Sequence, residues 1–178
     1  GWACATYLIV VLLTFRVFRA FRGSTNLCSG MNKAFVREPE FDGRAFCPRC
    51  GTLGAPVEHG ALDTHIREES RGKLGDSGWF CVFPRCDVAY FNLFDAVVMM
   101  DELKRPVYPH DLDAPICACF GLTLEHIERD VDEGSVARVK ALLERANSDQ
   151  ARCATAAANG RSCVPEVQRC YMKLRGGQ

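Results

Sequence analysis

The spacing of the cysteines constrains this chain more than any other feature. There are 11 cysteines in 178 residues, and eight of them lie in four spaced pairs: Cys47/Cys50, Cys81/Cys86, Cys117/Cys119 and Cys153/Cys163. Pairs of this kind are typical of metal sites, because two thiols on one turn can meet two thiols from another. An oxidised disulfide scaffold is the alternative. It is disfavoured because the cysteine count is odd and because bridges within Cys47/Cys50 or Cys117/Cys119 would staple little chain.

The composition fits a folded domain that needs no disulfides. Hydrophobic residues make up 48% of the chain, which is enough to build a core. Lys and Arg together number 22, as do Asp and Glu, so the net charge is zero and gives no argument for nucleic acid or an anionic membrane as partner. We find no Ser/His/Asp set, phosphate loop or paired catalytic carboxylates. The sequence therefore favours a metal protein that is not an enzyme, in a reducing compartment such as the cytoplasm.

The first 30 residues differ from the rest of the chain. The run from Trp2 to Phe15 is almost wholly apolar, and Arg16, Arg19 and Arg22 follow it without an acidic residue. This run is shorter than the roughly 20 apolar residues of a spanning helix. Three interpretations remain open: upstream sequence before a true start at Met31, the tail of a membrane anchor, or a buried helix.

The remaining sequence predicts an α+β protein in two small domains. A zinc-stabilised, β-rich domain is expected over 31–104, and a small helical domain over 117–178, joined by a proline-rich linker at 105–116. Hydrophobic patterning predicts strands at 79–83, 88–91 and 96–100, and a short helix over 62–74. Further helices are expected at 123–133, at 135–146 and from about Cys163 onward.

The first four paired cysteines form a candidate zinc site. Zinc prefers four soft ligands in a tetrahedron, and close pairs on turns approach it from two directions. The predicted ligands are Cys47, Cys50, Cys81 and Cys86. Such a set leaves no open position for water, so the zinc is expected to hold the fold. A rival set would combine Cys47 and Cys50 with His59 and His65, but we interpret these histidines as surface residues.

The second four paired cysteines have unequal spacing, which is not that of a zinc ribbon. The predicted ligands are Cys117, Cys119, Cys153 and Cys163. Unequal thiolate quartets are common for iron–sulfur clusters. Cys117 and Cys119 precede a predicted helix N-terminus at Thr123, where thiolates form more easily. Residues 135–178 hold eight basic and three acidic side chains, a surplus of five positive charges that suits an anionic centre. The alternative is that these charges only solvate helix surfaces.

Two sequence stretches carry a resemblance to known families. The run Pro115-Ile-Cys-Ala-Cys-Phe-Gly-Leu-Thr123, followed by Arg152-Cys153 and Arg161-Ser-Cys-Val164, resembles the [2Fe-2S] domain of bacterioferritin-associated ferredoxins. When the preceding pairs Cys47-x₂-Cys50 and Cys81-x₄-Cys86 are included, the order of motifs from about Met31 onward is similar to that of the N-terminal domain of CopZ-type copper chaperones. The resemblance implies Zn²⁺ on the first quartet and a [2Fe-2S] cluster on the second. It does not extend to the copper-binding domain of those chaperones.

Together these observations predict a metal-binding protein that transfers single electrons and serves copper handling. Its expected partner is a redox protein or a separate copper carrier or transporter, with a membrane involved only if residues 1–30 are an anchor. The alternative is a two-zinc protein-interaction module without redox activity. Cys4, Cys28 and Cys170 remain outside both quartets, and Cys170 is expected to be a core thiol. Met99 and Met100 should face opposite sides of a strand and pack in the core.

Overall fold

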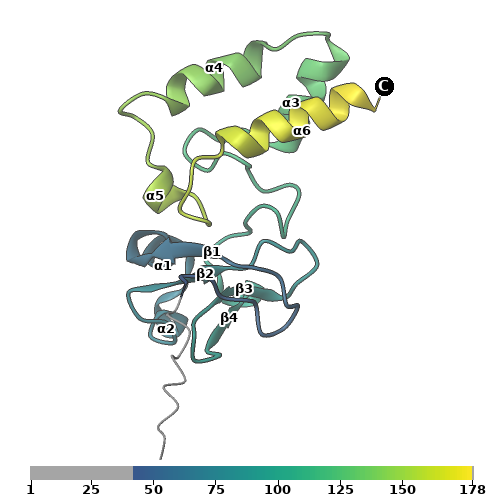
Figure 1. Ribbon diagram of the computed structural model, residues 1–178. Coiled ribbons are helices and arrows are strands. Elements are labelled where there is room, and N and C mark those ends of the chain that lie inside the picture. Colours follow the sequence, from purple (N-terminus) through teal and green to yellow (C-terminus); the bar gives the residue numbers. More distant parts are fainter. Residues whose placement is uncertain (1–41, 178) are drawn as a thin grey trace, which may run out of the picture. The chain divides into compact units, whose positions relative to one another are not determined.

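The computed structural model describes residues 42–177 of the chain. The apolar run, the expected start at Met31, Cys4 and Cys28 lie outside these residues. Within the described part, no helix is both long and apolar enough to cross a membrane. The elements are a small sheet with short helices, followed by four further helices, as expected for an α+β protein (Figure 1).

The sheet is an antiparallel meander in the order β1-β2-β3-β4. Its strands are β1 (Ala55–Glu58), β2 (Ser77–Phe80), β3 (Val88–Phe91) and β4 (Val97–Met99). The predictions for β3 and β4 are confirmed. The prediction of a strand through residue 83 is wrong beyond Phe80, because Cys81 begins a turn that returns the chain to β3. The short strand β1, which includes Pro56, was not predicted from the sequence.

Three short helices accompany the sheet: α1 (His59–His65), α2 (Glu68–Arg71) and the 3₁₀ helix η1 (Met100–Glu102). The single helix expected over 62–74 is therefore wrong. It is interrupted at Ile66, which has an extended backbone and forms a bridge with Leu103. The Glu102 carboxylate accepts hydrogen bonds from Ser70 and Lys73, which ties η1 to the α2 region.

The alternation of side chains in the strands divides the core into two layers. Phe80 and Tyr90 face the layer that contains α1, together with Leu62 and Val98. Trp79 and Phe91 face the other layer, which contains Cys47, Cys81 and Cys86. Met99 packs in this second layer and Met100 in the first, so the expectation that they face opposite sides is confirmed. The cysteines of the first quartet thus lie on one defined face of the sheet.

The second half of the described chain is helical, with a core of its own. It contains α3 (Leu124–Asp132), α4 (Ala137–Ala146), α5 (Cys153–Ala156) and α6 (Val164–Gly176). The predictions for α3, α4 and α6 are confirmed, whereas α5 was not predicted from the sequence. The fully buried Asp130 carboxylate accepts hydrogen bonds from the Val139 amide and the Arg138 guanidinium, which joins α3 to α4.

Residues 105–116 contribute to both cores. Val107 is buried with the residues around α1, while Tyr108 and Ile116 pack with the helical core. The proline-rich character of this segment, with Pro106 and Pro109, does not leave it free of packing. The domain boundaries assigned from the sequence remain predictions.

The segment around α5 packs against the sheet half of the molecule. His65 is only 1% exposed, and its Nε2–H donates to the Ala156 carbonyl at 3.0 Å. The Tyr90 hydroxyl donates to the Ala158 carbonyl at 2.9 Å. The expectation that His65 is a surface residue is therefore wrong, since α1 is covered by α5. His59 is exposed, as expected.

The burial of His65 predicts a stability that falls in mild acid. Burial lowers the pKa of His65 from 6.5 to about 4, so the folded protein keeps it neutral where the unfolded chain takes up a proton. This contribution to stability is present above pH 6.5 and is lost as pH falls toward 4. Through His65, lowering the pH from 7 to 5 should reduce the free energy of unfolding, measured with urea, by about 2 kcal/mol. In His65→Gln this part of the loss should be absent; an equal loss in both proteins would contradict the assignment.

Candidate metal centres

The first cysteine pair lies in a knuckle, a tight turn closed by backbone hydrogen bonds. The Cys47 amide donates to the Thr52 carbonyl at 2.9 Å, and the Gly51 amide donates to the Cys47 carbonyl at 2.8 Å. Gly51 has φ +70°, a conformation that favours glycine. The turn therefore places Cys47 and Cys50 on the same side, with their sulfurs directed at a common point.

The second pair flanks the connection between β2 and β3. Cys81 follows the last residue of β2, and its amide still donates to the Ala89 carbonyl of β3 at 2.9 Å. The chain then turns, and the Cys86 amide donates to the Phe83 carbonyl at 3.1 Å. The sheet thus fixes both ends of this loop and directs its two thiols toward the knuckle.

The four sulfurs of this set converge. All lie within 4.8 Å of one another; Cys47 Sγ is 3.8 Å from Cys86 Sγ and Cys50 Sγ is 3.5 Å from Cys81 Sγ. Four thiols around one point match the donor set and the size of a tetrahedral zinc site. The structure brings together this set and not the rival one, because His59 is exposed and His65 contacts Ala156.

The thiols of this quartet differ in acidity. Burial raises the pKa of Cys50, but hydrogen bonds from the Thr52 side chain and backbone outweigh this effect and lower it to about 7. Burial raises the pKa of Cys81 far above its usual value. Zinc binding must therefore displace a proton from a buried thiol, so its affinity should rise with pH.

His110 holds the loop between the last two cysteines, a contact that sequence reasoning missed. Its Nε2 lies 2.7 Å from the Cys81 carbonyl and its Nδ1 lies 3.0 Å from the Cys86 carbonyl. The ring also meets the Phe80 ring edge-on, with centroids 5.4 Å apart. His110 belongs to the proline-rich segment, where no periodicity marks a buried side chain. Its contacts make it a positioning residue for two of the candidate ligands.

Replacing His110 by phenylalanine should weaken zinc binding by about tenfold, because partners behind metal ligands typically contribute this much to affinity. Phenylalanine preserves the contact with Phe80 but removes both interactions with the carbonyls. Competition with a chromophoric zinc chelator measures the change. His59→Phe, at an exposed histidine of the same half, is the matched control. Equal affinity in both variants would refute the positioning role.

The Cys117/Cys119 pair lies in a second knuckle with the same backbone pattern as the first. The Cys117 amide donates to the Leu122 carbonyl at 3.1 Å, and the Gly121 amide donates to the Cys117 carbonyl at 2.8 Å. Gly121 has φ +73°. In both knuckles the glycine comes four residues after the first cysteine. The difference is the second thiol, which comes three residues after Cys47 but two residues after Cys117.

The four thiols of the second quartet interact with one another. A hydrogen bond from Cys163 lowers the pKa of Cys117 to about 6, and the same contact raises that of Cys163. Burial, followed by the charge of Cys119, raises the pKa of Cys153. Cys153 also interacts with Cys117 and with Cys163, so all four candidate ligands belong to one group. Among residues 42–177, only the first quartet gathers its ligand atoms as tightly as a single ion requires.

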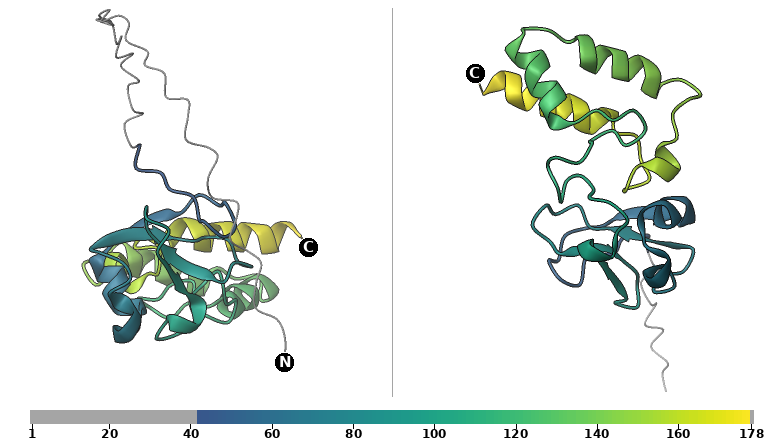
Figure 2. Two further views of the ribbon diagram at one scale, coloured as in Figure 1. Left: turned by 90° about the horizontal axis from the view of Figure 1, so that it is seen from below. Right: turned by 180° about the vertical axis from the view of Figure 1, so that it is seen from behind.

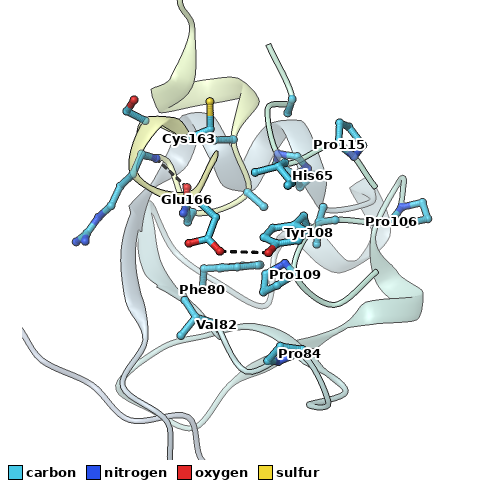
Figure 3. A pocket seen from close by; sticks show the side chains of 18 of the residues that line it. His65, Phe80, Val82, Pro84, Pro106, Tyr108, Pro109, Pro115, Cys163 and Glu166 are labelled. Atoms are coloured by element: carbon cyan, nitrogen blue, oxygen red, sulfur yellow. Dashed lines mark hydrogen bonds between the residues drawn. The ribbon is translucent and has the colours of Figure 1, made fainter. Parts of the chain in front are cut away.

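Cys170 lies outside both quartets. It is half-buried at the edge of the helical core, as expected, and its sulfur is 3.6 Å from the Tyr108 hydroxyl. The Tyr108 hydroxyl also donates to the Glu166 carboxylate at 3.1 Å. Tyr108 and Glu166 line a cavity of about 450 Å³ that is also lined by His65 and Cys163 (Figure 3).

Comparison with known proteins supports a CopZ-type zinc-binding domain in the first half. The zf_CopZ family model, described as a zinc binding domain, matches residues 44–104. The X-ray structure of the Archaeoglobus fulgidus CopZ N-terminal domain is similar, with a TM-score of 0.60 and 24% sequence identity. The alignment covers 70% of this chain and 96% of that one. No curated protein matched the sequence. The four converging cysteines lie within the range matched by the zinc model.

Proposed function

We propose that this chain is a small redox protein with one structural zinc and one [2Fe-2S] cluster, which transfers single electrons in copper handling. The observation that carries the proposal is the contrast between its two cysteine quartets. One quartet gathers its four sulfurs within 4.8 Å of one another, as a single ion requires, whereas the other brings four interacting thiols together without gathering them as tightly. A binuclear cluster takes two thiolates on each of two irons, so its four ligands are spread more widely than the ligands of a single ion.

The proposed zinc ligands have a structural role. The four thiols fill a tetrahedron and leave no position for water or substrate, so this centre is not catalytic. They connect the knuckle to the loop between β2 and β3, in a layer that also holds Trp79 and Phe91. This layer is small, and bound metal would supply much of its stability.

The surroundings of the second quartet favour an anionic centre. The Arg145 guanidinium lies 4.1 Å from the centroid of the Phe120 ring, which is next to Cys119. Its charge contributes to the lowered pKa of Cys117, after the hydrogen bond from Cys163. A cluster held by four thiolates gains negative charge when it accepts an electron. Positive side chains stabilise that reduced form and raise the potential at which the electron is taken up.

The link to copper rests on similarity to CopZ. The structure named CopZ shares the fold over 70% of the chain, and the sequence resemblance is to copper chaperones. The proposed substrate is Cu(II), which would accept one electron and leave as Cu(I) on a separate carrier. The reducing compartment that keeps nine described cysteines as free thiols would be the cytoplasm. This proposed step moves one electron and makes or breaks no bond in a substrate, so the proposed role is that of an electron carrier.

A spectrum with a metal assay tests this function. Protein purified without oxygen should be red-brown, bleach with dithionite and contain two irons, two sulfides and one zinc per chain. The reduced protein should then reduce Cu(II) in a one-to-one ratio. A colourless protein with two zincs, even after reconstitution with iron and sulfide, would refute the redox function. That result would favour the two-zinc interaction module.

A further inference from the structure

We propose that the zinc-bearing half, which holds the sheet and the first quartet, is a scaffold for the segment that carries Cys153 and Cys163. His65 and Tyr90 are the residues that position this segment. This inference rests on the proposed cluster site. The segment from 153 to 163 begins and ends with a candidate ligand. It therefore presents two thiols only if its middle is held in place.

The middle of the segment is tied to the zinc-bearing half by two hydrogen bonds between residues far apart in the sequence. His65 in α1 donates to the Ala156 carbonyl, and Tyr90 in β3 donates to the Ala158 carbonyl. Both donors are almost wholly buried, with 1% and 0% of their surfaces exposed. Because these buried side chains cannot form hydrogen bonds with solvent instead, loss of either bond would leave a buried polar group without its partner.

Close packing accompanies these bonds. A Cβ atom built on Gly60 in α1 would lie 2.9 Å from Cγ2 of Thr155, so α1 and α5 approach as closely as glycine allows. At the other end of the segment, the same construction on Gly160 reaches a methyl carbon of Val57 at 3.8 Å. The segment thus contacts the zinc-bearing half along most of its length.

The same segment also borders a cavity, which residues of the sheet half such as His65 and Phe80 line as well. His65 and Cys163 both line this cavity of about 450 Å³ (Figure 3), as do Ala157 and Ala158. A wall that borders open space lacks packing from that direction. The contacts with α1 and β3 therefore restrain the middle of the segment and help to fix the separation of Cys153 and Cys163. Fixing a loop in advance lowers the entropy cost of ligand binding.

The test compares variants that remove one donor each. In Tyr90→Phe and His65→Leu, iron should be lost to a ferrous chelator about tenfold faster than in the parent protein, with zinc content unchanged. His65→Gln retains a side-chain N–H, so its rate of iron loss should return most of the way to that of the parent protein. Tyr171→Phe is the matched control, because Tyr171 donates to the Ser135 carbonyl at 3.3 Å without touching the segment.

A second measurement does not depend on the cluster. In zinc-loaded protein prepared without iron, iodoacetamide should alkylate Cys153 and Cys163 faster in Tyr90→Phe than in Tyr171→Phe, with no difference at Cys119. Equal iron loss and equal alkylation in these two variants would overturn the scaffold role, while a red parent protein would leave the proposed function intact. A parent protein that never acquires iron would overturn the proposed function, and the alkylation of Cys153 and Cys163 would then decide the scaffold role by itself.

Discussion

Replacing Cys81 by serine is expected to abolish zinc binding and to unfold the sheet half of the protein. Cys81 is 0% exposed, and its sulfur is 3.5 Å from that of Cys50. Structural zinc contributes about 10 kcal/mol or more to folding, which is comparable to the whole stability of a small domain. A serine at this position would lose the thiolate and leave a hydroxyl in an apolar layer. Native mass spectrometry would measure the zinc, and circular dichroism the loss of sheet.

The matched control for this experiment is Cys170→Ser. It makes the same chemical change at a half-buried cysteine outside both quartets. This variant should keep its zinc and lose only about 1 kcal/mol of stability. A Cys81→Ser protein that still holds one zinc with native affinity would contradict the assignment of the first quartet.

Replacing Cys163 by serine is expected to remove the red chromophore while leaving zinc in place. Cys163 is 7% exposed and is the partner of Cys117 in the second quartet. Without it, only three of the four proposed ligands remain, so iron and sulfide should fall to near zero after purification without oxygen. Zinc should remain at one per chain, because the first quartet is intact. Visible absorbance and metal analysis on one sample would measure both results.

Cys170→Ser serves again as control, since it lies two turns further along the same helix, α6. It should retain the chromophore and its bleaching by dithionite. Retention of a full cluster in Cys163→Ser would exclude this thiol as a ligand. Loss of zinc together with the chromophore would show that the two halves depend on each other in both directions.

Local patterns were sufficient to predict much of the fold. The β-branched and aromatic run of β3 and the capped, periodic sequences of α3, α4 and α6 give elements that need little help from outside. The grouping of the first quartet also followed from spacing. A thiol pair on a knuckle and a thiol pair on a strand connection have few ways to meet except around one ion.

The missed features depend on contacts between residues far apart in the sequence. His65 looked like a surface residue because its partner, the Ala156 carbonyl, is 91 positions away. The strand ending at Phe80 could not be distinguished from a longer one, since Cys81 to Phe83 have strand-like side chains but belong to a turn. His110 gave no signal, because irregular backbone holds it against two carbonyls. The periodic pattern of hydrophobic residues in a sequence does not reveal such contacts.

The repeated knuckle has a consequence for how metal preference is encoded. The same two hydrogen bonds and the same left-handed glycine support both cysteine pairs, so the backbone by itself does not select a metal. Under the proposed assignment of zinc to the first quartet and a [2Fe-2S] cluster to the second, the difference lies in whether the second thiol is at the third or the second position after the first. Moving one thiol by a single residue changes which way it leaves the turn. In a turn with the same backbone, moving one cysteine by a single position would then be a short mutational route between the two proposed kinds of centre.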